Sequence, residues 1–163
     1  LDLRTPKPHI AILKAEGLSA AIVDVSGDIY VHGVPPSGEP FVIGIQHPRD
    51  SDTLLLRLRV TDLAVVTSGD YQRKYEIKDR TFNHIFDPRT GWPVAEAVSV
   101  TVLAKTATLA DALATAVMVL GSRAGLELIE AYPDVEALVV TCSPSGELLL
   151  FRSSGFAKYE MPP

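Results

Sequence analysis

The chain has 163 residues, of which 47% are hydrophobic and 21% are charged, and its formal net charge is −5. This length and apolar content are sufficient for one domain with a real core, and they exclude an intrinsically disordered chain. The acidic balance, without a basic stripe, argues against nucleic acid as a partner. The single cysteine excludes an intrachain disulfide and a zinc-cysteine cluster.

The first part of the chain is predicted to form a helix followed by strands. Residues 6–18 are expected to be helical, because Pro6 and Pro8 stand at the start of this stretch and Gly17 closes it. Apolar runs that alternate or are β-branched, bounded by Gly, Pro and Asp, predict strands. These strands are expected at 20–25, 29–32, 41–45, 53–60 and 63–67.

A Ser-Gly-Asp-Tyr segment, residues 68–71, follows the last of these strands. A strand that runs into a Ser-Gly turn can present backbone amides to a phosphate, and a tight hairpin is the alternative interpretation. The earlier Ser26-Gly27-Asp28 segment has the same two interpretations, a ligand-binding turn or a simple hairpin turn.

The most informative loop, residues 84–94, comes after a hairpin whose tip is predicted at 76–80. Its return strand is expected to run from 82 to 87 with alternating side chains, and to break at Asp87-Pro88 into a turn that Gly91 ends. Asp before Pro is an ordinary start for a turn, so these residues alone are weak evidence of function. His84, Asp87, Arg89 and Thr90 nevertheless stand within seven positions, just ahead of a helix with an isolated Asp.

The C-terminal part is predicted to contain two helices between strands. Residues 108–120 are expected to form the first helix, and Gly121-Ser122 to break it. The remaining elements are a helix at 123–132 and strands at 98–103, 135–142 and 147–151. Strands outnumber helices, and this periodicity favours an α+β fold with a mostly antiparallel sheet covered by helices on one face.

Asp111 is the only formally charged residue between Lys105 and Arg123. Asp111 and Thr115 are four positions apart, so both oxygen donors point to the same side of the predicted helix, a side expected to be half-buried. Carboxylate and hydroxyl oxygens suit Mg²⁺ or Ca²⁺. The alternative is that Thr115 bonds to its own helix and Asp111 pairs with Arg73 or Arg89.

These motifs occur together, in order and at matching spacings. The sequence His-Ile-Phe-Asp-Pro-Arg-Thr-Gly-Trp-Pro-Val, with Ser-Gly-Asp-Tyr before it and Ala-Asp-Ala-Leu-Ala-Thr-Ala after it, resembles the ApbE family of FAD:protein FMN transferases. The resemblance implies a tunnelling-fold-like architecture. It also implies that residues 1–163 form a single ApbE-like domain that lacks the family's N-terminal portion.

The resemblance further implies a Mg²⁺-dependent reaction. FAD is cleaved, FMN is attached through a phosphoester to a Ser or Thr of an acceptor flavoprotein, and AMP is released. By motif, Asp111 and Thr115 match the metal ligands, and His84 and Asp87 match residues with a catalytic or flavin-binding role. The residues implied to bind FAD are Ser68, Gly69, Tyr71, His84, Asp87, Thr90, Gly91 and Asp28.

Several interpretations stay open at this point. The chain could bind or hydrolyse FAD without protein transfer, or be a shortened interaction domain. The family's N-terminal portion could be supplied by a companion chain, and the protein could form a homodimer. The resemblance also implies a periplasmic or membrane-anchored location, although no targeting signal is visible in the sequence.

Overall fold

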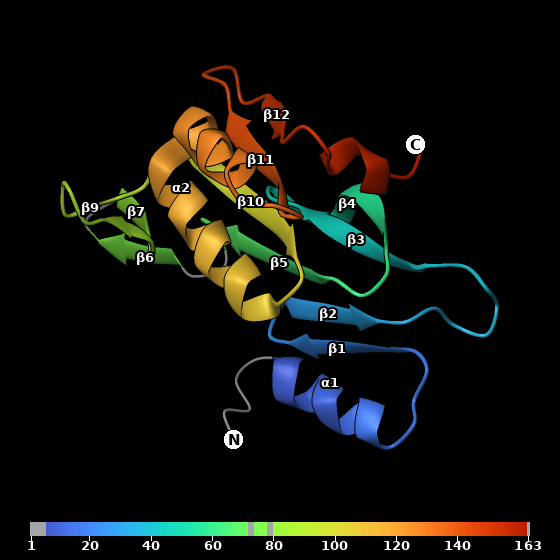
Figure 1. Ribbon diagram of the computed structural model, residues 1–163. Helices are drawn as coiled ribbons and strands as arrows, with labels where there is room; N and C mark the ends of the chain where they lie inside the picture. Colours follow the sequence, from blue (N-terminus) through green and yellow to red (C-terminus); the bar gives the residue numbers. More distant parts are fainter. Residues whose placement is uncertain (1–5, 72–73, 78–79, 163) are drawn as a thin grey trace.

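A six-stranded antiparallel sheet forms the centre of the molecule (Figure 1). The computed structural model describes residues 6–71, 74–77 and 80–162. Every pairing within this sheet is antiparallel, which confirms the predicted α+β class and sheet type. In order across the sheet, the strands are β1 (Ala21–Val25), β2 (Asp28–His32), β5 (Ala64–Gly69), β10 (Ala97–Ala104), β11 (Glu136–Cys142) and β12 (Leu148–Arg152).

Strand β10 lies at the centre of the sheet and is buried along its whole length. Its nearly continuous apolar sequence fits a strand that is covered on both faces. Its register places Val100 opposite Ser68 of β5 and Val139 of β11. The edge strand β1 instead alternates partly buried and exposed residues, as expected for a strand with one solvated face.

Both helices, α1 (Pro6–Ala15) and α2 (Ala107–Glu130), pack on one face of the sheet, as predicted (Figure 1). The predicted break in the second helix is confirmed, because Gly121 has non-helical angles of φ 81° and ψ −179°. By length and composition alone α2 could cross a membrane, a test that core helices also pass. Its buried residues recur every three or four positions: Ala107, Ala110, Leu113, Ala114, Val117, Met118, Gly121, Gly125 and Ile129.

The opposite face of the sheet is covered by a β-hairpin and a short 3₁₀ helix. The hairpin consists of β3 (Phe41–His47) and β4 (Asp50–Val60), and the 3₁₀ helix is η1 (Phe156–Tyr159). Leu58 and Phe156 are completely buried in this second core. The sheet therefore has a hydrophobic core on each side.

Two small hairpins connect β5 to β10 and extend beyond the end of the sheet (Figure 1). They are β6 (Lys74–Ile77) with β7 (Arg80–Asn83), and β8 (Phe86–Asp87) with β9 (Trp92–Pro93). The predicted hairpin tip is bounded by β6 and β7, but residues 78–79 lie outside the described residues. The expected strand 82–87 is wrong, because the chain leaves the strand conformation between β7 and β8.

Candidate functional site

The first half of α2 places two predicted metal ligands on one side. The helix begins after Thr106, whose hydroxyl accepts a hydrogen bond from the Leu109 amide at 3.2 Å. Asp111 and Thr115 follow four residues apart and are both exposed. The expectation of a half-buried polar side is therefore wrong for these two residues, although Ala114 beside them is buried.

The sheet brings a further oxygen to this side of α2. Ser68, in β5, is only 8% exposed, and its Oγ lies 3.5 Å from Thr115 Oγ1. The side chain of Val66, two residues earlier, packs in the core under α2, so Ser68 faces the same helix. Asp28 lies directly opposite Val66 in the β2–β5 register and therefore also faces α2. Asp28 and Ser68, on the sheet face that α2 covers, thus lie on the same side of the sheet as Asp111 and Thr115 of α2.

Asp28 has an unusual electrostatic environment for an acidic residue. Burial, followed by the nearby carboxylates of Asp111 and Asp24, raises the pKa of Asp28 from 3.8 to about 6. Asp24 belongs to β1, and its Oδ1 accepts from the Gly27 amide of the following turn at 2.8 Å. The turn has positive φ at both Ser26 (57°) and Gly27 (95°), consistent with a tight hairpin connection.

The Ser68-Gly69 segment is strand and not the expected turn. Both residues belong to β5 and are in register with β10, and the next amide, that of Asp70, donates to the Val98 carbonyl at 3.0 Å. Gly69 is needed for close approach, because a Cβ at this position would lie 2.5 Å from Tyr71 Cε1. Tyr71 lines a pocket of about 160 Å³ on the sheet face opposite α2.

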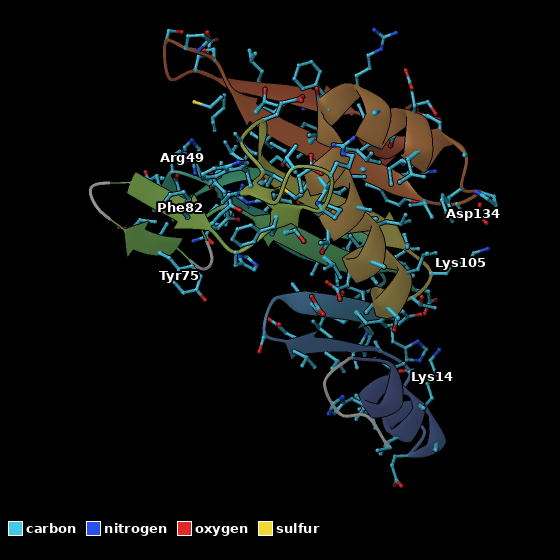
Figure 2. The ribbon with its side chains drawn as sticks, turned by 90° about the vertical axis from the view of Figure 1, so that its left-hand side faces the viewer. Lys14, Arg49, Tyr75, Phe82, Lys105 and Asp134 are labelled. Atoms are coloured by element: carbon cyan, nitrogen blue, oxygen red, sulfur yellow. The ribbon has the colours of Figure 1, made fainter. Side chains whose placement is uncertain are left out.

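An ion pair that the sequence did not suggest fixes this segment. Arg49, in the β3–β4 turn, donates to both carboxylate oxygens of Asp70 at 2.6 and 2.7 Å. Such a bidentate pair sets orientation as well as attraction. It connects the separate β3–β4 hairpin to the end of β5, and Arg49 is labelled in Figure 2. The residues are 21 positions apart, so no local sequence signal could have revealed the pair.

The signature loop, residues 84–94, is a short hairpin closed by a turn. The Asp87 carbonyl accepts from the Gly91 amide at 2.8 Å, and Gly91 has a positive φ of 72°. Both Asp87 carboxylate oxygens bind the Arg89 side chain, at 2.9 and 2.8 Å. This hydrogen bonding lowers the pKa of Asp87. Arg89 therefore pairs with Asp87 and not with Asp111, and Arg73, the other considered partner of Asp111, lies outside the described residues.

The signature loop is attached to α2 at the kink. Arg89 Nη2 donates to the Val119 carbonyl at 3.3 Å. Glu96, just after the loop, accepts from the Ser122 amide at 2.8 Å and from its hydroxyl at 2.7 Å. Because Gly121 interrupts the helix, Ser122 begins a new helical segment, and Glu96 caps its free amide. Sequence reasoning missed Glu96, since the contact spans 26 positions.

His84 lies between β7 and β8 and is partly exposed, but its Nδ1 is buried and has no hydrogen-bond partner in the described part of the chain. The backbone around it is fixed by Asn83, whose side chain accepts from the Ile85 amide at 3.0 Å and donates to the Val94 carbonyl at 2.8 Å. A buried polar atom without a partner requires an explanation, and ligand binding is one.

Thr90 and Gly91 are exposed in the turn of the signature loop, and Thr90 lines, with Asp87 and Glu96, a pocket of about 140 Å³ against α2. This pocket includes Met118, about one turn beyond Thr115. The predicted residues fall into three groups. Asp28, Ser68, Asp111 and Thr115 form one group, His84, Asp87, Thr90 and Gly91 the second, and Gly69 and Tyr71 lie on the other sheet face.

The first group fits a hard divalent cation by its donor chemistry. Asp28 and Asp111 supply carboxylate oxygens, and Ser68 and Thr115 supply hydroxyl oxygens, which are the atoms Mg²⁺ prefers. Across residues 6–71, 74–77 and 80–162, no group of three or more His, Cys, Asp or Glu side chains could hold a metal ion. A cation here would therefore depend on water and phosphate oxygens for the rest of its ligands.

An aromatic surface borders the signature loop and was not anticipated from the sequence. Trp92, Tyr75 and Phe86 are 63%, 57% and 54% exposed. Together with Phe82 they line an apolar pocket of about 370 Å³, and Figure 2 shows Tyr75 and Phe82 on the β6–β7 hairpin. A larger hollow of about 670 Å³ lies between β4 and the C-terminal residues and includes none of the predicted site residues.

Comparison with known proteins matches most of this chain to the ApbE family. The model of the ApbE family matches residues 8–139. An FAD:protein FMN transferase of Vibrio cholerae is 37% identical over 121 residues, which cover 73% of this chain and 36% of that protein. The Treponema pallidum transferase is 36% identical over 141 residues, covering 80% of this chain and 39% of that protein.

Solved structures give the same result. The flavin transferase ApbE from Vibrio cholerae has a TM-score of 0.78 at 32% identity, and the match covers 94% of this chain and 48% of that one. The ApbE protein of Thermotoga maritima has a TM-score of 0.73 at 32% identity, covering 88% of this chain and 45% of that one. The chain therefore spans less than half the length of these relatives.

Proposed function

The chain belongs to the ApbE family, and we propose that it forms the metal-binding and signature-loop part of an FAD:protein FMN transferase. The proposed reaction transfers FMN from FAD to a Ser or Thr of an acceptor flavoprotein and releases AMP. The observation that carries this proposal is the convergence of Asp111 and Thr115 with Ser68, at 3.5 Å from Thr115, beside the signature loop.

Asp111 and Thr115 would hold Mg²⁺, with Ser68 next to them. Both proposed ligands are exposed, so a substrate pyrophosphate can reach them. Bound there, Mg²⁺ would neutralise charge on the pyrophosphate and help align the attacking hydroxyl. The hydroxyls of Ser68, in β5, and Thr115, in α2, lie 3.5 Å apart without a bound substrate.

In the proposed transfer, the acceptor hydroxyl oxygen bonds to the FMN-side phosphorus, and the bond from that phosphorus to the AMP oxygen breaks. We assign His84 as the group that takes the hydroxyl proton, because an imidazole can act as a general base and Nδ1 has no partner in the described residues. Asp87 acts as a positioning residue, since both its carboxylate oxygens hold Arg89 and thereby the turn.

Flavin binding is assigned to the surfaces on either side of these groups. Thr90 and Gly91 are exposed on the signature loop, and Tyr71 lines the pocket on the other face of the sheet. Since relatives are more than twice as long as the matched segment, a companion N-terminal portion or a second copy would complete the FAD cleft. We also propose a periplasmic or membrane-anchored location, which cell fractionation would test.

The test is to incubate the protein with FAD, Mg²⁺ and candidate acceptor flavoproteins. Protein-bound flavin is detected by its fluorescence after denaturing electrophoresis, and AMP is quantified in the same reaction. The proposal predicts one AMP for each flavin attached, at a Ser or Thr. AMP and free FMN without bound flavin would show FAD hydrolysis instead of transfer, and no AMP at all would contradict both activities.

A further inference from the structure

Asp28 presents its carboxylate to the same space as the proposed metal ligands. Its position opposite Val66 in the β2–β5 register sets its side chain on the sheet face that α2 covers. Along that face of β5, the next residue is Ser68, which contacts Thr115 at 3.5 Å. Asp28 therefore approaches the group from β2, while the other members come from β5 and α2.

The carboxylates of Asp28 and Asp111 have no cationic partner in the described part of the chain. Neither forms a hydrogen bond or ion pair with another described residue, although the side chain of Asp28 is partly buried. Burial and the neighbouring charge of Asp111 raise the pKa of Asp28, so its ionised form is disfavoured. A partly buried carboxylate such as Asp28 is unfavourable without a counter-charge, and the nearby carboxylate of Asp111 adds repulsion when no cation is present.

We propose that Asp28 is a further ligand of the divalent cation bound by Asp111 and Thr115, so that the cation connects β2 to α2. This inference rests on the metal site of the proposed function. The cation supplies the counter-charge that both carboxylates lack. It also gives the Ser-Gly-Asp turn a direct role in metal binding, where the family resemblance implied only contact with FAD.

The experiment measures Mn²⁺ binding by the 163-residue chain, from the EPR signal of the free ion. Mn²⁺ takes the same oxygen ligands as Mg²⁺. The variants are Asp28→Asn, Asp111→Asn and the control Asp24→Asn. The control removes the same charge nearby, and its amide oxygen can still accept the 2.8 Å hydrogen bond from Gly27. Thermal unfolding with and without Mn²⁺ is a second readout.

Asp28→Asn is expected to raise the Kd for Mn²⁺ at least about tenfold, and Asp24→Asn at most about twofold. Without metal, Asp28→Asn should melt no lower than the wild type, because it removes repulsion from Asp111. Saturating Mn²⁺ should then raise its Tm less than that of the wild type.

If Asp28→Asn binds Mn²⁺ as tightly as Asp24→Asn, the inference is wrong. If Asp111→Asn nevertheless loses Mn²⁺, the metal site of the proposed function stands without Asp28. A wild-type chain that binds no Mn²⁺ would overturn both. If Asp28→Asn binds Mn²⁺ normally but no longer releases AMP from FAD, the metal role of Asp28 is rejected. Asp28 would then act as a proton acceptor in the reaction.

Discussion

Replacing Gly121 with alanine should break the contact between Glu96, just after the signature loop, and Ser122 of α2. Gly121 has φ 81° and ψ −179°, a backbone region open essentially to glycine, and strain there amounts to about 1–3 kcal/mol for another residue. A Cβ would also lie 2.2 Å from Glu96 Oε2, so the Glu96 carboxylate has to move, and we expect this movement to break its hydrogen bonds with Ser122. The lost cap adds about 0.5–2 kcal/mol. Gly121→Ala should therefore lower the free energy of unfolding by about 1.5–5 kcal/mol.

The assay is urea unfolding followed by circular dichroism, with Gly146→Ala as the matched control. Gly146 also has a positive φ, 87°, but a Cβ there would meet nothing within 4 Å. The control reports backbone strain alone, whereas Gly121→Ala adds the displacement of Glu96. In a double-mutant cycle with Glu96→Ala, the double variant should lose less stability than the sum of the two single variants, because either single change already removes the cap. Equal losses for the two glycine variants, or no coupling, would refute this account of the kink.

Three further predictions concern electrostatics and the second core. Hydrogen bonds from Ser122 lower the pKa of Glu96, so the charged carboxylate stabilises the fold above pH 4.5. This stabilisation is lost as the pH falls through the folded-state pKa of Glu96. The difference in unfolding free energy between wild type and Glu96→Gln should therefore shrink on acidification from pH 7 to pH 3. Arg49→Lys should cost about 1 kcal/mol in urea unfolding, because lysine cannot form the bidentate pair with Asp70; an unchanged midpoint would show that the pair contributes nothing. Phe156→Ala should cost about 3–5 kcal/mol, since this ring is completely buried, and a loss under 1 kcal/mol would contradict its place in the core.

The sequence correctly predicted the helices and strands whose conformation depends on residues close to one another in the chain. The apolar spacing of residues 108–120 and the Gly121-Ser122 break correctly predicted the helix and its kink. The continuous apolar run at 98–103 correctly predicted a buried strand. The wrong prediction at 82–87 has a local cause, because Asn83 bonds the Ile85 amide with its side chain and diverts the chain from the strand.

Contacts between distant segments could not be predicted in the same way. The Asp28–Val66 register depends on the order of strands across the sheet, which alternation within a strand does not encode. The exposure of Asp111 and Thr115 also depends on which segments lie over α2. The sequence therefore identified the residue types of the candidate site, while the structure was needed to group them.

The most direct test of the proposed metal-dependent flavin chemistry is AMP release from FAD by the wild type and Asp111→Asn, with Mg²⁺ or with EDTA. Asp134→Asn is the control, since this exposed carboxylate is paired with Lys105 at 2.6 Å (Figure 2). We predict Mg²⁺-dependent AMP release by the wild type and the control, and its loss in Asp111→Asn and in EDTA. AMP release that persists in Asp111→Asn at the wild-type rate would contradict the account.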